Sequence, residues 1–488
     1  MTSRSGLNAI VSLDEVITSS EAAKRLSARG RSGVASRQHI ARAAKGSELW
    51  RSEALQLPNR QRLLAHRSFV GTPRFLRQAE GILAETRPGV SRCLAALRHR
   101  RVVLKPDAER LLGGQDGRSY PRDSDALKEL GIIHEDVGTA LERFAMPSAG
   151  DTRSLAQGHY HRLVRSALVA RLVVEHLRRL SIISWGGNVL SDGPLKLARF
   201  SGYPFSAFGW SWLSPLLTWG SHTASPAPVL IDVFTTTCDT FDVEAFSYRL
   251  RRATGRLGRS PIGAISARRF TNSAHKLARR QGLVTIPLGE IFGEAALDLM
   301  AEVSMLLSSI PDEDADHAQS VDALAASLTQ LDEHPFVQEL RSLGFETLAA
   351  LLARSEGWED VKVGTTVTHE QTSREIDVCG MRQSGRSVLL VECKARRRSG
   401  VLRVEEVNKF FLEVVPAFLK HNHNFQVENC SAEIWTSGGV GADAELALAS
   451  IKLDRRVAPA LVDGSRVESR LPQTLAPCKR LLRTIAQE

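Results

Sequence analysis

Three residues in the last third of the chain have the types and spacing of a phosphodiesterase site. The run SVLLVECKA (387–395) is apolar and strand-like, yet it carries Glu392 and Lys394 near its end, and Asp377 lies in a second strand-like run, SREIDVCG (373–380). Burying such charges unpaired in a core strand would be costly. A divalent ion held by carboxylates neutralises a scissile phosphate and generates hydroxide near neutral pH. The pattern therefore indicates metal-assisted phosphodiester hydrolysis.

Each of these residues has an expected role. Asp377 and Glu392 would supply oxygens to a Mg²⁺ (or Mn²⁺) ion, with the backbone carbonyl of Cys393 as a third ligand. Residues two apart in a strand share a face, so Lys394 would lie beside Glu392 and orient the attacking water or stabilise developing negative charge. The alternative is a surface salt bridge between Glu392 and Lys394, which would contribute little to stability.

The flanking sequence predicts the elements that position these residues. A helix is expected in HPFVQELRSLGFETLAALLARSEGW (334–358), because its apolar residues recur at three and four. WEDVKVGTTV and SREIDVCG are β-rich, and the turn RQSGR leads into SVLLVECKA. VEEVNKFFLEVVPAFLK, SAEIWTSGG, ADAELALASI and VAPALVDG then alternate between helix and strand. The predicted order is helix, β-hairpin, strand, helix, strand, helix, strand.

This order, with Asp377, fourteen intervening residues and then Glu392-Cys393-Lys394, resembles the PD-(D/E)XK nuclease superfamily, which has the restriction-endonuclease-like fold. From about Phe336 to Leu471, roughly a third of the chain, the segment looks most like the Mrr-type restriction endonucleases. The similarity lies in a Phe-Glu pair in the first helix, the WTSGG strand end before an Ala-rich helix, and the ALVDGSRV turn. The sequence EIDV…VECKAR is also similar to that of archaeal Holliday-junction resolvases.

The resemblance implies a Mg²⁺-dependent DNA endonuclease that restricts foreign or modified DNA, with a role in antiviral defence. By resemblance, Glu346 would be a further or water-mediated metal ligand. Mrr-type proteins often carry Gln where Glu392 stands, and the proline of the family name is absent before Asp377. One active site per chain cuts one strand, so cutting both strands would need a homodimer or two successive nicks.

Basic residues follow the proposed site directly. The run ARRRSGVLR (395–403) contains Arg396, Arg397, Arg398 and Arg403, a cluster that fits the positioning of DNA phosphates better than the reading of bases. A solvated loop is the alternative interpretation.

The net charge of +10 is concentrated at the N-terminal end. Residues 1–110 hold 21 Lys/Arg against 9 Asp/Glu, which is +12, and the rest of the chain is therefore about −2. This imbalance favours nucleic acid as a partner over a merely solvated face. Two helices, a basic second member and a following hairpin predict a winged-helix-like region, with a recognition helix near Ser91–Arg101 that includes Arg98, Arg100 and Arg101.

The middle of the chain repeats the order of predicted elements found in the last region. PAPVLIDVFTTTC (226–238) parallels RSVLLVECKARRR (386–398), and each is followed by helix, strand, helix and strand. Such a repeat of element order suggests an internal duplication, although convergent α/β patterning is the alternative. Asp232-Val233-Phe234 stands where the later copy has Glu392-Cys393-Lys394, so the lysine is missing. We expect the middle copy to be a degenerate, inactive nuclease-like domain.

The fold class predicted from these patterns is multidomain α/β. A basic winged-helix-like region is expected over 1–115, the degenerate domain over 125–308, and a nuclease domain with an αβββαβ core over 321–488. The predicted boundaries are LLGGQDGRSYPRDSD (111–125) and the acidic SIPDEDADHAQS (309–320).

Composition narrows the class of protein further. The six cysteines form no CxxC pair, which argues against a zinc site or a disulfide framework and fits a reducing cytoplasm. No run is long enough to cross a membrane, and no apolar segment of the secretory type is found near the first residues, so a cytoplasmic protein without a membrane partner is expected.

Two other functions remain open at this point. A structure-specific nuclease acting on junctions or repair intermediates would share the same active site. A DNA-binding regulator with an inactive nuclease fold would be expected to have lost Asp377, Glu392 or Lys394, and all three are present. The chain has no Walker-type GxxxxGK motif, so any dependence on ATP would have to come from a partner protein of a defence system.

Overall fold

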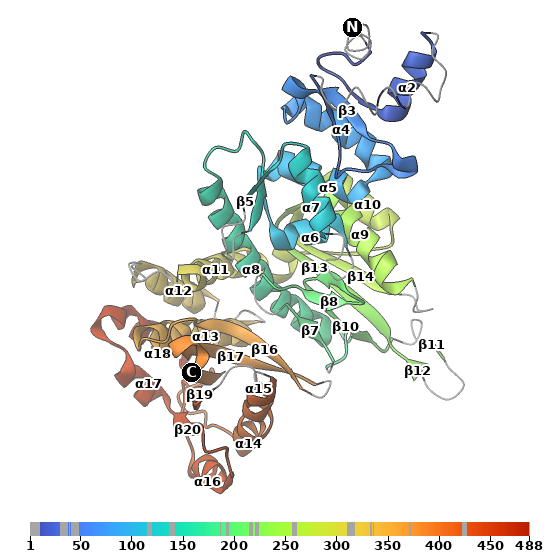
Figure 1. The fold of residues 1–488 in the computed structure, drawn as a ribbon. Coiled ribbons are helices and arrows are strands. Elements are labelled where there is room, and N and C mark those ends of the chain that lie inside the picture. The colour runs from blue at the N-terminus through green and yellow to red at the C-terminus, as the bar shows by residue number, and fades with distance from the viewer. Residues whose placement is uncertain are drawn as a thin grey trace.

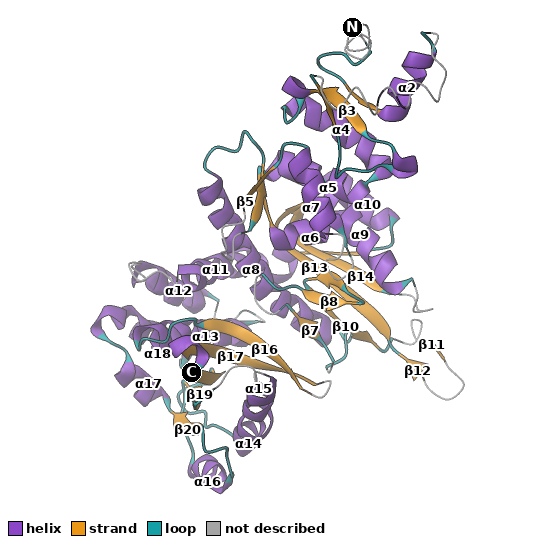
Figure 2. Cartoon of the chain, in the orientation of Figure 1, coloured by secondary structure: helices purple, strands orange, loops and turns teal. Residues whose placement is uncertain are grey.

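The computed structural model describes most of the chain. The described residues are 10–29, 38, 40, 48–114, 120–135, 142–185, 187–191, 195–213, 218–219, 224–255, 261–309, 318–331, 334, 336–369, 372–421 and 427–487. Two five-stranded mixed sheets dominate them, one in the middle region and one near the C-terminus, and helices lie between the two sheets (Figure 1 and Figure 2). The predicted class, multidomain α/β, is confirmed.

The C-terminal sheet has the strand order β16-β17-β18-β19-β20. It contains β16 (Lys362–His369), β17 (Thr372–Arg382), β18 (Ser387–Lys394), β19 (Asn429–Thr436) and β20 (Val457–Val462). The first two pairings are antiparallel and the last two are parallel. A short 3₁₀ turn, Gln383–Gly385, joins β17 to β18.

Helices cover both faces of this sheet. On one face, α13 (Val337–Ser355) and α18 (Ala476–Ile485) pack with Leu389 and Val391. On the other face, Val388 and Leu390 pack under a helical stretch formed by α14 (Val404–Lys409), a π-helical turn (Phe410–Val414) and α15 (Val415–His421). Two shorter helices, α16 (Ala442–Ser450) and α17 (Gly464–Arg470), flank β20 in sequence. The element order predicted for this region is confirmed.

The middle sheet repeats this arrangement. Its order is β7-β10-β13-β14-β15, from β7 (Val189–Leu190), β10 (Ala207–Ser211), β13 (Ala227–Cys238), β14 (Ile262–Phe270) and β15 (Val284–Pro287). Its first two pairings are also antiparallel and its last two parallel. The helices α8 (Thr152–Arg179), α9 (Thr240–Thr254) and α10 (Asn272–Arg280) precede or connect the strands as α13, α14–α15 and α16 do in the later sheet. The two sheets therefore share strand order, strand direction and helix order.

Two small hairpins are inserted in sequence between strands of the middle sheet. They are β8 (Ala198–Phe200) with β9 (Tyr203–Phe205), and β11 (Thr218–Trp219) with β12 (Ala224–Ser225).

A continuous hydrophobic core joins the two sheets. It takes in residues of α8, of α11 (Leu288–Ser309), of α12 (Ala318–Gln330), of α13 and of α18. Figure 1 shows these helices lying between the sheets. The predicted boundary at 309–320, most of which lies outside the described residues, is therefore crossed by a shared core, because α11 packs on α8 while α12 packs on α18.

The N-terminal region holds two small sheets. The first has the order β1-β3-β2, with β1 (Val16–Thr18), β2 (Leu49–Arg51) and β3 (Leu63–His66), and α2 (Ser19–Ser27) follows β1. The second has the order β4-β6-β5, with β4 (Val102–Leu104), β5 (Ile133–Glu135) and β6 (Arg143–Ala145). The segment SRQHIARAAKG (36–46), whose serine start and glycine stop predict a helix, lies almost entirely outside the described residues.

The second sheet changes the predicted end of this region. In chain order, α4 (Pro73–Thr86), α5 (Pro88–Arg100), β4, α6 (Lys105–Leu112), α7 (Tyr120–Glu129), β5 and β6 form one unit that runs through residue 115. The glycine-rich part of the predicted linker ends α6, since Gly113 has a left-handed backbone with φ 67°. Its second half begins α7, whose Ala126 and Leu127 are fully buried. The described parts of this stretch, 111–114 and 120–125, thus belong to the ends of folded helices.

Candidate active site

The end of β18 brings Asp377 and Glu392 together. The last paired residues of β17 and β18 are Val378 and Val391, so the register places Asp377 opposite Glu392 one step further. The backbone N–H of Cys393 donates a hydrogen bond to Oδ2 of Asp377 at 2.7 Å. This bond fixes the Asp377 carboxyl against the neighbouring strand.

Lys394 lies beside Glu392, as its spacing predicts. Its Nζ is 2.6 Å from Oε1 of Glu392, and the side chains of Lys394 and Glu392 are only 24% and 17% exposed. Both continue the row of Val388 and Leu390 along the strand. Although burial alone would lower it, Glu392 and then Asp377 raise the pKa of Lys394 above its usual value. The lysine is therefore a fixed positive charge at neutral pH.

Negative charge is crowded at this strand end. Burial, followed by the charges of Glu392 and Glu346, raises the pKa of Asp377 well above its usual value, and Lys394 only partly offsets this. Burial also raises the pKa of Glu346. Three carboxyl groups that interact in a buried place are typical of a site that holds a cation.

The donor set fits a hard divalent ion. Mg²⁺ commonly takes one or two carboxylates and completes its shell with water and substrate oxygens, which Asp377 and Glu392 satisfy. Among the described residues, no group of three or more His, Cys, Asp and Glu side chains is already arranged to enclose a metal ion. An ion at this site would therefore rely on solvent and substrate for its remaining ligands. The side chain of Cys393 is buried, so only its backbone is suited to ligation.

Glu346 is held by a residue that sequence reasoning missed. Its side chain on α13 is 5% exposed, and Nη1 of Arg171 on α8 lies 2.8 Å from its Oε2. The same guanidinium reaches Glu375 on β17 at 3.3 Å. A helix of the middle region thus contributes a positive charge to the candidate site. The sequence held one signal, an arginine inside the apolar run LVARLVV (168–174).

A large cavity opens beside this contact. It has a volume of about 930 Å³ and is lined by α8 and β7 on one side and by α13 and β17 on the other. Arg171, Glu346 and Glu375 form part of its wall, together with Lys409 of α14. The cavity therefore lies between the two sheets and reaches one of the predicted site residues.

The four basic residues after β18 differ in their availability. Arg397, Arg398 and Arg403 are exposed. Arg396 is half-buried, its guanidinium pairs with Glu406, and its backbone N–H donates to Oγ of Ser437 at 2.7 Å. Arg396 therefore stabilises the loop, while the other three face solvent.

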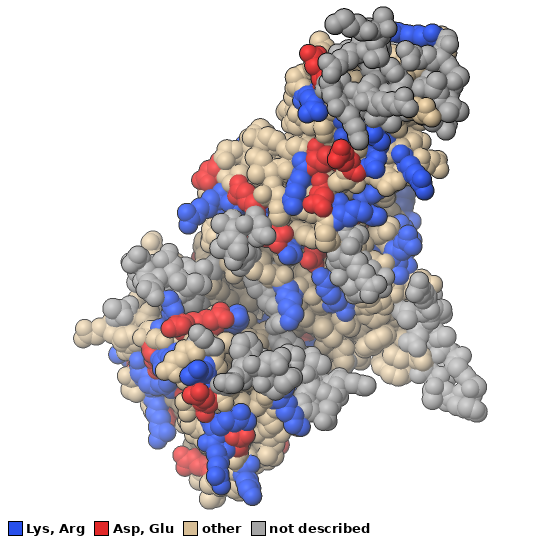
Figure 3. Space-filling model, in the orientation of Figure 1, with Lys and Arg blue, Asp and Glu red and all other residues tan. Residues whose placement is uncertain are grey.

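The predicted recognition helix needs correction. It corresponds to α5, which is mostly buried against α4, α6 and α9, because its residues Val90–Leu94 and Leu97 are part of the core. Arg100 is engaged by Asp242 of α9 at 2.7 Å and is not free for DNA, and Arg98 pairs with Glu80 at 2.9 Å. Arg101 is exposed. On the face drawn in Figure 3, basic and acidic side chains are interspersed over this region.

The middle sheet lacks this constellation at the corresponding positions. Ala207 pairs with Ile231, so the register puts Ser206 opposite Asp232, where the later sheet has Asp377 and Glu392. The N–H of Val233 donates to Oγ of Ser206 at 2.9 Å, as that of Cys393 does to Asp377. Phe234 replaces the lysine.

The remaining carboxylate of the middle copy is already neutralised. Oδ2 of Asp232 lies 2.6 Å from Nη2 of Arg249, and the two side chains are 0% and 1% exposed. Asp232 is therefore neutralised by a buried ion pair and is not accessible to a metal ion.

A scan against protein-family models finds no match, and a search of curated proteins also finds none.

Proposed function

We propose that this chain is a metal-dependent endodeoxyribonuclease with a restriction-endonuclease-like C-terminal domain. The observation that carries the proposal is the meeting of Asp377, in the middle of β17, with Glu392 and Lys394 at the end of the adjacent strand β18. The strand order and helix order around them agree with the PD-(D/E)XK resemblance. The middle region would be a degenerate copy of the same fold, since its sheet has the same pattern of pairings.

The residues divide the chemistry between them. Asp377 and Glu392 would hold Mg²⁺ or Mn²⁺, which when bound supplies charge neutralisation and an activated water. Lys394 keeps its proton, so it stabilises negative charge on the phosphate and orients the nucleophile. Arg397, Arg398 and Arg403 would contact neighbouring phosphates. Glu346, engaged by Arg171, would act on the site through its charge.

DNA binding is assigned to the N-terminal unit. The order α5-β4-α6-α7-β5-β6, with the sheet β4-β6-β5, has the connectivity of a winged helix. In that connectivity the recognition helix is α7, whose exposed residues include Arg122 and Lys128. Restriction or antiviral defence, in the cytoplasm and with a homodimer or partner proteins, remains the biological role proposed from the resemblance.

Cleavage of supercoiled plasmid and of modified phage DNA, with Mg²⁺, Mn²⁺ or EDTA, tests the proposal. We expect metal-dependent cutting that Lys394→Ala reduces by at least about 100-fold. Lys362→Ala is the matched control, because Lys362 also pairs with an acid two residues away, Asp360 at 2.7 Å, but lies on the edge strand β16. Cutting that persists in EDTA, or in Lys394→Ala, would overturn the assignment.

Two other outcomes point to the alternatives. Faster cutting of a four-way junction than of linear duplex would indicate a structure-specific nuclease. Tight DNA binding without cutting under any metal would indicate a regulator that retains the fold.

A further inference from the structure

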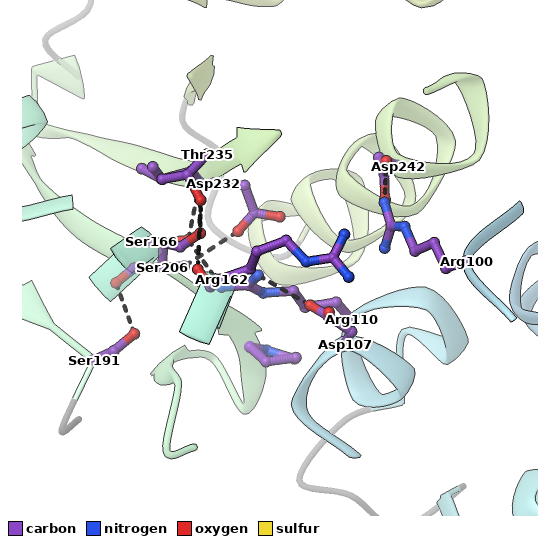
Figure 4. A network of polar contacts seen from close by, with 12 residues as sticks. Arg100, Asp107, Arg110, Arg162, Ser166, Ser191, Ser206, Asp232, Thr235 and Asp242 are labelled. Carbon is purple, nitrogen blue, oxygen red and sulfur yellow. Dashed lines mark hydrogen bonds and ion pairs between the residues drawn. The ribbon is translucent and has the colours of Figure 1, made fainter. Parts of the chain in front are cut away.

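The middle sheet has a small cavity at the place that corresponds to the candidate active site. Its volume is about 30 Å³, and its lining includes Val233–Thr236, the segment that follows Asp232 on β13. A void needs only about 10–15 Å³ to hold a water molecule, so this one admits a single small group and excludes a base with its sugar. Figure 4 shows the polar network around it.

The acids of the corresponding active site are absent or neutralised here. Ser206 and Phe234 stand in the positions of Asp377 and Lys394, and Asp232 is paired with Arg249. The hydroxyl of Ser206 accepts from Nη2 of Arg110 at 2.9 Å. An arginine thus reaches the place where the later copy has a carboxylate.

Positive charge dominates the cavity wall. Three arginines line it, Arg100, Arg110 and Arg162, against one acid, Asp107. Asp242, which pairs with Arg100, lowers this excess but does not cancel it. Figure 4 shows Arg110 and Asp107 of α6 close to Arg162 of α8.

Two of these arginines have unused hydrogen-bonding capacity. Arg110 is 5% exposed, and its buried Nε has no hydrogen-bond partner among the described residues. Nε of Arg162 donates to the carbonyl of Gly158 in its own helix at 3.2 Å, and Arg162 makes no ion pair within the described part of the chain. Arg110 also pairs with Asp107 at 3.4 Å through Nη1, so its unused donor is Nε. A buried donor left unsatisfied is costly, which favours a bound acceptor.

The titration of the neighbouring groups is consistent with an electropositive cavity. Burial, and then the charge of Arg162, lowers the pKa of His159 to about 4. Burial and then the nearby Arg100 lower the pKa of Arg162. Both groups would gain from an anion beside them.

We propose that this cavity binds a terminal phosphate group. Arg110 and Arg162 would supply charged donors, and the hydroxyls of Ser166 and Thr235, which lie 3.3 Å apart, would supply neutral ones. Arg162 and Thr236 are half-buried, so the group would enter between them from the surface. The degenerate copy has exchanged a cation site for an anion site, and this inference does not depend on cleavage by the C-terminal domain.

Calorimetric titration of the full chain in EDTA, with the Lys394→Ala variant to exclude cleavage, tests the proposal. The probes are inorganic phosphate and a short oligodeoxynucleotide with either a 5′-phosphate or a 5′-hydroxyl. We expect one site per chain for phosphate or for the phosphorylated oligonucleotide. Loss of one charged hydrogen-bond donor should weaken binding in Arg162→Ala by about tenfold or more.

Arg165→Ala is the matched control, because Arg165 is half-buried on the same helix but does not line the cavity. Its affinity should equal that of the parent. Preference for the 5′-phosphorylated oligonucleotide would identify a nucleic-acid end as the source, and equal affinity for inorganic phosphate would identify a free phosphate compound.

An independent readout avoids reliance on a variant. The imidazole signals of His159 in the nuclear magnetic resonance spectrum of the unmutated cavity should shift on addition of the binding probe. The proposal is overturned if neither probe saturates, if Arg162→Ala binds as tightly as the parent, or if His159 does not respond to a probe that binds.

Discussion

The guanidinium of Arg171 lies 2.8 Å from a carboxylate oxygen of Glu346, and this contact links two copies of one sheet architecture. Arg171 belongs to α8 of the middle region and Glu346 to α13 of the C-terminal region. The contact lies within the shared core, where α8 and α13 both border the cavity of about 930 Å³. A helix of the middle region therefore contacts a residue of the candidate site.

Arg171→Ala should destabilise the chain through Glu346. Removing the guanidinium leaves a carboxyl that is 5% exposed without its partner, at a cost of about 1–3 kcal/mol in the free energy of unfolding. Urea unfolding followed by circular dichroism measures this. The double variant Arg171→Ala/Glu346→Gln should recover part of the loss, because the buried charge is then gone.

The control for this prediction is Arg179→Ala. Arg179 also joins α8 to α13, through Glu339, but its side chain is 38% exposed, and Glu339 is not a predicted site residue. Its removal should cost less than about 1 kcal/mol. Equal losses for the two single variants, with no recovery in the double variant, would contradict a specific role of the Arg171–Glu346 pair.

Asp377→Asn should abolish the stabilisation that a divalent metal ion gives. Asn keeps an oxygen to accept the hydrogen bond from Cys393, but it removes one charge from a crowded group that includes Glu392 and Glu346. Thermal unfolding with and without Mn²⁺ is the measurement. At a hundredfold excess over the dissociation constant, a metal ion should stabilise the wild type by about 2.7 kcal/mol and the variant hardly at all. An equal response of both proteins would exclude Asp377 as a ligand.

The C-terminal elements were predictable because their signals are local. Each strand is an apolar run bounded by turns, and the alternation of Val388 and Leu390 with Leu389 and Val391 matches two covered faces. The proximity of Asp377 and Glu392 follows from the same pattern, because two antiparallel strands joined by a short turn pair residues at equal distances from that turn.

Contacts between distant segments were beyond local reasoning. Arg171 reaches Glu346 only because α8 packs near α13, and the sequence of neither helix indicates which residue the other contributes. The same holds for α5. Its basic end predicts a recognition surface, but in the structure Arg100 pairs with Asp242, which lies 142 residues away in the sequence. The described parts of the predicted linker at 111–125 contribute to helix ends, because glycine and charge mark the ends of short helices as well as the gaps between domains.

Cys393 should be replaceable without loss of cleavage. Its side chain is buried in the core, and only its backbone N–H, and by resemblance its carbonyl, serves the site. Cys393→Val fills a similar volume and leaves the backbone in place, so its cleavage rate should stay within about threefold of the wild type, as expected for a tolerated core exchange. Lys394→Ala, one residue away, is the contrasting variant. A Cys393→Val protein that folds but cannot cut would assign a role to the thiol.

The ion pair between Asp232 and Arg249 should behave as a structural element only. Both side chains are fully buried at 2.6 Å, so Asp232→Ala should cost about 3–5 kcal/mol by leaving Arg249 uncompensated. The double variant Asp232→Leu/Arg249→Met removes both charges and should be markedly less destabilised. Chemical denaturation gives the energies, and cleavage by the folded double variant should persist. Loss of cleavage in that variant would indicate a catalytic role for the middle sheet.

Acid should destabilise the chain partly through His159. Its side chain is 4% exposed, and burial lowers its pKa from 6.5 to about 4, so the folded state keeps it neutral while the unfolded state takes up a proton. Its contribution to stability is complete above pH 6.5 and is lost as the pH falls from 6.5 towards 4. Between pH 7.5 and pH 5 this loss amounts to about 2 kcal/mol. The difference between wild type and His159→Gln isolates it, because every other titrating group is common to both proteins.

The measurement is urea unfolding of both proteins at the two pH values in the absence of phosphate. His159→Gln should lose about 2 kcal/mol less than the wild type between pH 7.5 and pH 5, whatever its stability at pH 7.5. His161→Gln is the control, since His161 lies on the same helix but is half-buried, and burial lowers the pKa of its imidazole. If the two histidine variants change the pH dependence of stability equally, the positive charge around the cavity does not contribute to keeping His159 neutral. Burial on α8 alone would then explain the lowered pKa.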